Sequence, residues 1–263
     1  MYLKSVLQMA SLMLHFRNGR TLVQRMRTGE PCDEVVLWDG TRISHPPGRG
    51  GLLEVVVELW LEHVYTGRFY RPEDGDVIID AGANVGIFAI LMARQNRRCR
   101  VIALEPFAEN FKYLEANVAR ACPENVICCE VALGAGFSKG QMQEVGSRSL
   151  DHLLRTDLSA ADGVPVIPLG GLLDLAHADL ARGQEIDLLK VDIEGSEYDV
   201  FAAASPDLIG RFKRIAMEYH DHLRPGTLEL LRRVLSPTHE ITVRPSTLEG
   251  CGILLAQRGN LKK

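Results

Sequence analysis

From residue 76 onward, short runs of apolar residues alternate with segments of helical periodicity. Continuous apolar strands that alternate with helices indicate a parallel sheet covered on both faces. The last two runs follow each other without a helix between them, so we expect those two strands to be antiparallel to each other. The pattern predicts strands at 77–79, 100–104, 126–131, 186–191, 212–217, 240–243 and 252–256, and helices at 85–95, 108–121, 196–204 and 226–235.

The chain before residue 76 is less regular, and we interpret 1–75 as an N-terminal cap region on a domain that spans 76–263. Within that domain, segment 137–184 shows no clear period, which is typical of a functional or mobile insertion. In the cap region, the pattern predicts a helix over 1–27, a short hairpin over 35–43 with its turn at Asp39 and Gly40, and a second helix over 52–65 that is ended by Gly67.

Composition narrows the class of protein. The 263 residues are 46% hydrophobic and 24% charged, which is ordinary for a globular chain, and the formal net charge is −4. A mildly acidic chain without a long basic run does not suggest binding to nucleic acid. The six cysteines include no Cys-x-x-Cys pair and no zinc-ligand spacing, so we expect reduced thiols and a cytoplasmic location.

Residues 1–16 are rich in apolar side chains, but Lys4, Gln8 and His15 interrupt them. The stretch is too short to span a bilayer and lacks a small-residue cleavage site. We therefore expect no transmembrane segment and interpret the stretch as an amphipathic helix that docks on a surface. A homodimer formed through this N-terminal region is one arrangement that such a helix allows.

The strongest local motif follows the strand at 77–79 and opens the next helix. It reads Asp80-Ala-Gly-Ala-Asn-Val-Gly86. Gly82 permits a sharp turn and close approach of a ligand to the backbone, and Gly86 permits close packing of the helix on the sheet. The free N–H groups at the helix start favour a carboxylate or phosphate, while Asp80 offers an acceptor to an ammonium group or to water.

The next strand ends in Glu105 and Pro106, where an acidic residue is placed to hold the two hydroxyls of a ribose. Together with the glycine turn, this predicts a nucleoside-binding crevice at the carboxyl ends of parallel strands. The turn lacks the Gly-x-Gly-x-x-Gly spacing of dinucleotide-binding proteins. Because Asp80 would repel a pyrophosphate but suits a sulfonium or amino group, the sequence favours S-adenosylmethionine over NAD or FAD.

Charged residues gather at two further strand ends. Such groups are costly to bury unless they are paired or used, so the alternatives are a structural network and a catalytic site beside the cofactor. A histidine is well suited to take a proton near neutral pH. The residues are Lys190, Asp192, Glu194 and Glu197 at the end of one buried strand, and Glu218 and His220 just after the next.

Taken together, these motifs resemble the FkbM family of S-adenosylmethionine-dependent methyltransferases. The resemblance covers roughly residues 52–256, and Lys-x-Asp-x-Glu-Gly-x-Glu at 190–197 is its most specific mark. It implies an α/β fold of the class I methyltransferase type. This is a Rossmann-like three-layer sandwich with a mostly parallel seven-stranded sheet and one antiparallel strand.

The resemblance also assigns residues to the cofactor. The sequence departs from the family pattern at 168–174, where two glycines loosen a turn. We therefore expect a different acceptor specificity. Position by position, the resemblance implies a methionine end lined by Asp80, Gly82, Ala83, Asn84 and Gly86, a ribose held by Glu105 with Pro106, an adenine along Ala132 and Leu133, and a further contact from Asp192.

Methyl transfer to oxygen, commonly a hydroxyl of a sugar, polyketide or other small natural product, is the activity that the resemblance implies. A general base must then remove the hydroxyl proton. We expect His220 to be that base, oriented by Glu218 or Asp192. The other candidates for the catalytic site are Asp192 and Glu194 as bases and Lys190 as a partner of Glu218.

Three alternatives stay open. In the first, a Mg²⁺ ion bound by Asp192, Glu194 and Glu218 replaces the general base by lowering the pKa of the hydroxyl, although we do not expect a metal. The chain could be a module that binds S-adenosylmethionine without catalysis, although the charged residues at 190–197 exceed what binding needs. A nucleotide-dependent oxidoreductase is the third, and the missing glycine pattern argues against it.

Overall fold

The computed structural model describes residues 2–144, 152–156, 163–177 and 185–259 of the chain. Its centre is a seven-stranded sheet in which β13 runs opposite to the other six strands. This confirms the expected mostly parallel sheet with one antiparallel strand. In spatial order the strands are β12 (His239–Pro245), β13 (Cys251–Arg258), β11 (Arg214–His220), β10 (Leu188–Val191), β3 (Val77–Ala81), β4 (Arg100–Leu104) and β5 (Val126–Cys129).

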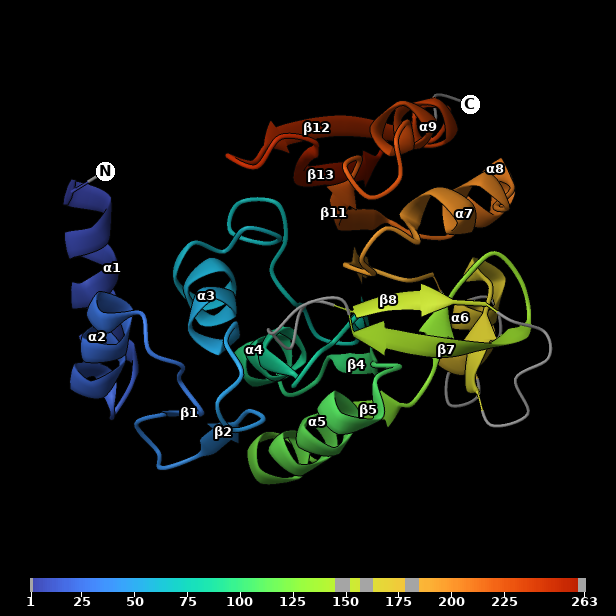
Figure 1. The fold of residues 1–263 in the computed structure, drawn as a ribbon. Coiled ribbons are helices and arrows are strands. Elements are labelled where there is room, and N and C mark those ends of the chain that lie inside the picture. The colour runs from blue at the N-terminus through green and yellow to red at the C-terminus, as the bar shows by residue number, and fades with distance from the viewer. Residues whose placement is uncertain (1, 145–151, 157–162, 178–184, 260–263) are drawn as a thin grey trace.

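Helices cover both faces of this sheet (Figure 1). A separate group of buried side chains lies on each face. Successive strand residues point to opposite faces, so Ile78 packs in one group while Val77 and Ile79 pack in the other. The three expected layers are therefore present. One face carries α4 (Ile87–Gln95) and α5 (Ala108–Ala121), and the other carries α6 (Leu169–His177), α7 (Glu197–Ala202), α8 (Pro206–Ile209) and α9 (Thr227–Leu235).

Parallel pairing brings the carboxyl ends of β3, β4, β10 and β11 to one edge of the sheet. The register places Lys190 of β10 beside Asp80 of β3. Strand β11 continues to His220, beyond its predicted end at Met217, so Glu218 and His220 lie within the strand and not after it. The extra residues pair with β13, which the sequence pattern alone did not align with β11.

The N-terminal region contains more elements than the pattern predicts. The helix expected over 1–27 is two helices, because the N–H of Arg17 donates to the carbonyl of Val36 at 2.7 Å instead of continuing the helix. The helix expected over 52–65 ends at Leu61, and Gly67 does not end it. The elements are α1 (Tyr2–His15), α2 (Gly19–Thr28), β1 (Glu34–Val36), β2 (Arg42–Ser44), α3 (Leu52–Val56) and the π-helix η1 (Val57–Leu61).

This region packs against the sheet domain. Phe16 at the end of α1 belongs to the same group of buried side chains as Phe88 of α4. Asn117 of α5 joins the two regions, because its side-chain oxygen accepts the N–H of Ser44 and its amide donates to the carbonyls of Ser44 and Val85, each at 2.8 Å. The boundary near residue 75 stays a prediction.

A second, four-stranded sheet occupies much of the segment for which the sequence predicts no element. Strand β7 reads Ser-Lys-Gly-Gln-Met-Gln-Glu, and its nearly polar sequence hides it from a search for apolar runs. The strand predicted over 126–131 ends at Cys129. The order of the second sheet is β6 (Ala132–Leu133), β9 (Val164–Ile167), β7 (Ser138–Glu144) and β8 (His152–Arg155).

Candidate active site

The glycine turn after β3 is held by the backbone of two neighbouring strands. Gly82 has a φ of +78°, and a Cβ atom there would lie 1.8 Å from the carbonyl oxygen of Asp192. The N–H groups of Gly82 and Ala83 both donate to the carbonyl of Leu104, at 3.0 and 2.8 Å. A side chain at Gly82 would therefore push the turn away from the end of β10. The sequence predicted that a ligand would approach Gly82 closely, and the atom that does so here belongs to the protein's own backbone.

Glu105 is positioned by the same turn. One carboxylate oxygen accepts the N–H of Asn84 at 2.7 Å, and the other accepts the N–H of Phe107 at 2.9 Å. Each carboxylate oxygen has a second lone pair, so both can also accept a hydrogen bond from a ligand. Burial raises the pKa of Glu105 to about 7, although the two N–H donors act in the opposite direction.

A cleft opens beside this turn at the carboxyl edge of the sheet, and we call it the cofactor cleft. Most of its lining residues come from the ends of β3, β4, β6 and β10, and Met142 of β7 with Leu154 of β8 adds the second sheet to its wall. The lining residues are Ala81, Gly82, Asn84, Leu104, Glu105, Pro106, Asn110, Val131, Ala132, Leu133, Met142, Leu154, Asp192, Ile193, Glu194 and Ser196.

Three of the expected cofactor residues do not line this cleft: Asp80, Gly86 and Ala83, the last of which lines a neighbouring cavity instead. Gly86 starts α4 with a φ of +92°, and a Cβ atom there would lie 2.8 Å from Leu114 of α5, so its role is helix packing. Asp80 is fully buried beneath the turn and faces Lys190, whose Nζ lies 3.2 Å from a carboxylate oxygen of Asp80. Burial raises the pKa of Asp80, and the charge of Lys190 partly offsets that rise.

Lys190 connects the turn to the next strand. Its Nζ donates to the carbonyl of Gly82 at 2.8 Å and lies 3.6 Å from a carboxylate oxygen of Asp192. The expected pairing of Lys190 with Glu218 is replaced by pairing with Asp80 and Asp192. Burial lowers the pKa of Lys190, but these two carboxylates outweigh it and the net shift is upward, which keeps the side chain charged.

His220 lies between two carboxylates of the 190–197 block. Its Nδ1 is 3.0 Å from Glu197, and its Nε2 is 3.5 Å from Glu194. Glu197 is fully buried and also accepts the N–H groups of Ile193 and Gly195. The residue that orients His220 is thus Glu197, and not Glu218 or Asp192 as expected.

These contacts set the charge of His220. Burial alone would lower its pKa, but the hydrogen bond and charge of Glu197 and the charge of Glu194 raise it to about 10. Burial and the nearby Asp192 raise the pKa of Glu194 to about 8 and that of Glu218 to about 7. At neutral pH, His220 is therefore an imidazolium ion beside carboxylates that titrate near neutrality.

Tyr65 from the N-terminal region reaches into the same site. Its hydroxyl lies 3.4 Å from Asp192 and 3.4 Å from Glu218, and the side chain is buried. We call the six charged residues and this tyrosine the charged cluster. Its members are Tyr65, Lys190, Asp192, Glu194, Glu197, Glu218 and His220.

A smaller chamber adjoins the cofactor cleft and shares Gly82, Asn84 and Asp192 with it. We call it the side chamber. Its far wall comes from the N-terminal region, including Glu58 of the π-helix and Tyr65, and Lys190 also lines it. Asp192 is therefore placed where a molecule in the side chamber would meet one in the cofactor cleft.

Two residues that line the cofactor cleft have an unusual backbone conformation. Asn84 and Glu194 have φ values of +51° and +50°, in the left-handed region that residues with a side chain seldom adopt. Both line the cofactor cleft. Strained positions of this kind gather at functional sites, where the surrounding contacts hold them.

Comparison with protein families supplies the assignment of the chain. The model for the methyltransferase FkbM domain matches residues 80–238, from Asp80 of the glycine turn to the loop before β12. The chain belongs to the FkbM methyltransferase family.

Three curated relatives show how this FkbM-family chain compares in length. It is 25% identical to the AMB antimetabolite synthetase AmbE of Pseudomonas aeruginosa over 74% of this chain, which is only 11% of that protein. It is 27% identical to the 31-O-demethyl-FK506 methyltransferase FkbM of Streptomyces tacrolimicus, over 62% of this chain and 73% of the relative. It is 25% identical to the methyltransferase sdnD of Sordaria araneosa, over 54% of this chain and 65% of the relative.

Solved structures resemble this FkbM-family chain loosely. An rRNA methylase from Streptococcus thermophilus is 12% identical over 71% of this chain and 88% of its own, with a TM-score of 0.44. In the described part of the chain, no helix combines the length and apolar character needed to cross a bilayer.

The match to the FkbM family also separates the residues that sequence reasoning could find from those that it missed. Tyr65 and Glu58 lie before the matched range 80–238. No motif marks them, and only the packing of the N-terminal region against α4 brings them to the site. The role of Glu197 could have been predicted, because Glu197 belongs to the 190–197 motif and no partner was assigned to it.

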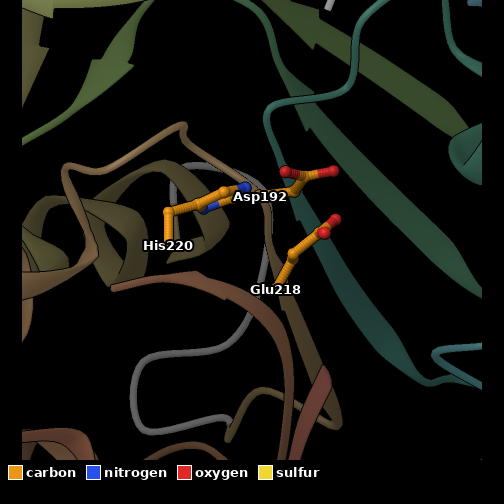
Figure 2. Close-up of side chains that lie close together, drawn as sticks. All are labelled: Asp192, Glu218 and His220. Atoms are coloured by element: carbon orange, nitrogen blue, oxygen red, sulfur yellow. The ribbon is translucent and has the colours of Figure 1, made fainter. Parts of the chain in front are cut away.

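Three members of the charged cluster lie close enough together to be considered for a metal ion. Figure 2 shows Asp192, Glu218 and His220 pointing toward a common space, and their ligand-type atoms lie within 4.8 Å of one another. The expected Mg²⁺ set contained Glu194 in place of His220. Lys190 Nζ already lies 3.6 Å from a carboxylate oxygen of Asp192, and we assign no metal to this group of residues.

Proposed function

We propose that this protein transfers the methyl group of S-adenosylmethionine to a hydroxyl oxygen of a small natural product. The observation that carries the proposal is the junction at Asp192. There, a cleft with a ribose-type acceptor at Glu105 meets a charged cluster that contains carboxylates able to take a proton near neutral pH. A cofactor on one side and an acceptor on the other would place the two reactants in contact.

The cleft offers contacts for each part of such a cofactor. The spare lone pairs of Glu105 suit the two ribose hydroxyls, and Ala132 with Leu133 provides an apolar wall for the adenine. The turn at Gly82 and Asn84 would hold the methionine end. The bound cofactor supplies a methyl group activated by the positive sulfur. The protein's part is to hold that group in line with the acceptor oxygen.

The hydroxyl must lose its proton, and the ion pairs of His220 change the role that we propose for it. An imidazolium held by Glu197 and Glu194 has no free site for a proton. Glu218 is the better base, because its pKa of about 7 leaves a large unprotonated fraction at neutral pH and enough basicity to act. His220 would stabilise the negative charge that develops, and Asp192 would bind the hydroxyl.

Lys190 and Asp80 act through the turn in this proposal. Lys190 fixes the carbonyl of Gly82 and the carboxylate of Asp192, and Asp80 keeps Lys190 in place. Together they would hold the methionine end of the cofactor at a fixed distance from the charged cluster. The Tyr65 hydroxyl lies 3.4 Å from both Asp192 and Glu218, so its proton would offset part of the repulsion between these two carboxylates.

Oxygen as the acceptor atom is supported by one relative. The Streptomyces tacrolimicus relative is named as a methyltransferase of 31-O-demethyl-FK506, in which the methylated atom is an oxygen. The family assignment also favours methyl transfer over hydride transfer by an oxidoreductase. A module that only binds the cofactor would not need the buried charges at Glu197 and His220, which are costly to desolvate.

The test is product analysis with a panel of sugars, polyketides and other hydroxyl compounds. Purified protein, S-adenosylmethionine and each compound are incubated, and mass spectrometry measures S-adenosylhomocysteine and the methylated product. We expect a product that carries the new methyl group on oxygen, and much slower formation of that product by Glu218→Gln. Bound cofactor without turnover on the whole panel would favour the binding module, and a methyl group on nitrogen or carbon would contradict the acceptor class.

A further inference from the structure

The first two helices are the basic part of an acidic chain. Residues 1–29 contain five of the 30 Lys and Arg residues and none of the 34 Asp and Glu residues. Arg17, Arg20 and Arg27 are exposed and form no ion pair with the described residues, whereas Arg25 pairs with Glu30. Arg20 and Arg27 are seven positions apart on α2, so they lie on one side of that helix.

Helix α1 exposes a second apolar stripe in addition to the one that it buries. Leu12 and Phe16 pack into the core, while Leu7 and Leu14 are 63% and 72% exposed. These two leucines are seven residues apart and therefore share a face, and Val6 and Met13 repeat the same spacing beside them. A helix that buries one apolar face and exposes another presents a surface suited to contact with something else.

Trp38 extends this stripe. Its indole N–H donates to the carbonyl of Leu14 at 2.7 Å, while 63% of the side chain stays exposed. Five of the eight large hydrophobic side chains that are exposed in the described residues belong to this surface. We define the N-terminal docking surface as the exposed apolar residues Val6, Leu7, Met13, Leu14 and Trp38, together with the exposed Arg17 after α1 and Arg20 and Arg27 on α2, which packs against α1.

We propose that the N-terminal docking surface binds the interface of an anionic lipid membrane. Helices that lie in a membrane interface combine exposed Leu and Trp side chains with unpaired Lys and Arg, because the apolar face enters the lipid and the cations meet the headgroups. A second copy of this chain fits less well, since pairing two such surfaces would bring two sets of unpaired arginines together. The proposal does not depend on the proposed methyl transfer.

Figure 1 shows α1 and α2 at the edge of the molecule, on the side away from strands β7 and β8 of the second sheet. The surface is also distinct from the charged cluster. Its variants can therefore be tested without altering a residue of the cofactor cleft or the side chamber. The exposed positions of Leu7, Leu14, Arg20 and Arg27 mean that their substitution should leave the fold intact.

The experiment is co-sedimentation of the full chain with vesicles of phosphatidylcholine and phosphatidylglycerol in equal parts, at low and high salt. Vesicles of phosphatidylcholine alone are the reference. We expect binding to the anionic vesicles that weakens with salt, and a loss of about tenfold or more in Leu7→Glu/Leu14→Glu and in Arg20→Glu/Arg27→Glu. Leu248→Glu and Arg233→Glu, which are exposed elsewhere, should bind like the wild type.

Three results would overturn the proposal. The first is no sedimentation with anionic vesicles. The second is an equal loss in the variants at Leu248 and Arg233, which would mean that binding is not specific to this surface. The third comes from light scattering: a wild-type dimer that Leu7→Glu/Leu14→Glu turns into a monomer, without vesicle binding by either, would assign the surface to a second copy of the chain.

Discussion

The cofactor cleft and the charged cluster meet at Asp192, but they are built in different ways. The cleft is shaped by backbone, with the N–H groups of Asn84 and Phe107 fixing Glu105 and the close approach of Gly82 to β10 fixing the turn. The cluster is held by side chains from three separate parts of the chain: residue 65, residues 190–197 and β11. We conclude that changes in the cleft should alter cofactor binding, whereas changes in the cluster should alter turnover.

The largest effect is expected for Glu218→Gln. Removing a general base lowers kcat by about 10² to 10⁴-fold, while binding of S-adenosylhomocysteine should change less than about twofold because Glu218 does not line the cleft. Steady-state kinetics and calorimetry measure the two quantities. Glu249→Gln, an exposed carboxylate in the loop after β12, is the control. Unchanged kcat in Glu218→Gln would place the base elsewhere.

The pH dependence of kcat separates Glu218 from His220 as the base. A base works in its unprotonated form, so kcat should rise as the pH increases through the pKa of Glu218, about 7, and then level off. If His220 were the base, the rise would continue to a pH of about 10. A profile measured with saturating substrates across this range decides between them.

Tyr65→Phe should have a smaller effect. The variant loses the hydroxyl that lies 3.4 Å from both Asp192 and Glu218, but it keeps the ring that packs on Phe88. We expect kcat to fall about tenfold, which corresponds to the weakening of one hydrogen bond to a charged group. Cofactor affinity should not change. Tyr113→Phe on α5 is the matched control, and equal losses in the two variants would remove Tyr65 from the site.

Metal removal should have the smallest effect. Lys190 and His220 supply positive charge at the cluster, so we expect EDTA to change kcat by less than about twofold. Activity that EDTA abolishes and Mg²⁺ restores would instead show that Asp192, Glu218 and His220 hold a cation. The assay is the same one used for Glu218→Gln.

The cleft was largely predictable from the sequence, because its parts are local. A strand, a glycine turn and an acidic residue at the next strand end occupy fixed positions along the chain, and parallel pairing brings such ends together. The exceptions are Asp80 and Gly86, which face the protein, and Ala83, which lines the side chamber. Composition and spacing do not tell which side of a turn a ligand occupies.

The six charged members of the charged cluster were predictable from the sequence, but their pairing was not. Glu197 and His220 are 23 residues apart on α7 and β11, and only the packing of these elements brings them to 3.0 Å. Tyr65 carries no motif at all. The second sheet was missed for another reason, since its strand β7 has almost no apolar residues to reveal a period.

The most direct test of the account is titration calorimetry of the wild-type protein with S-adenosylhomocysteine, with NAD⁺ as the comparison ligand and both repeated on Glu105→Ala. We predict a dissociation constant near micromolar for S-adenosylhomocysteine and no binding of NAD⁺. Glu105→Ala should weaken binding about 100-fold through the loss of hydrogen bonds to the ribose. Failure of the wild type to bind S-adenosylhomocysteine, or equal binding by Glu105→Ala, would contradict the account.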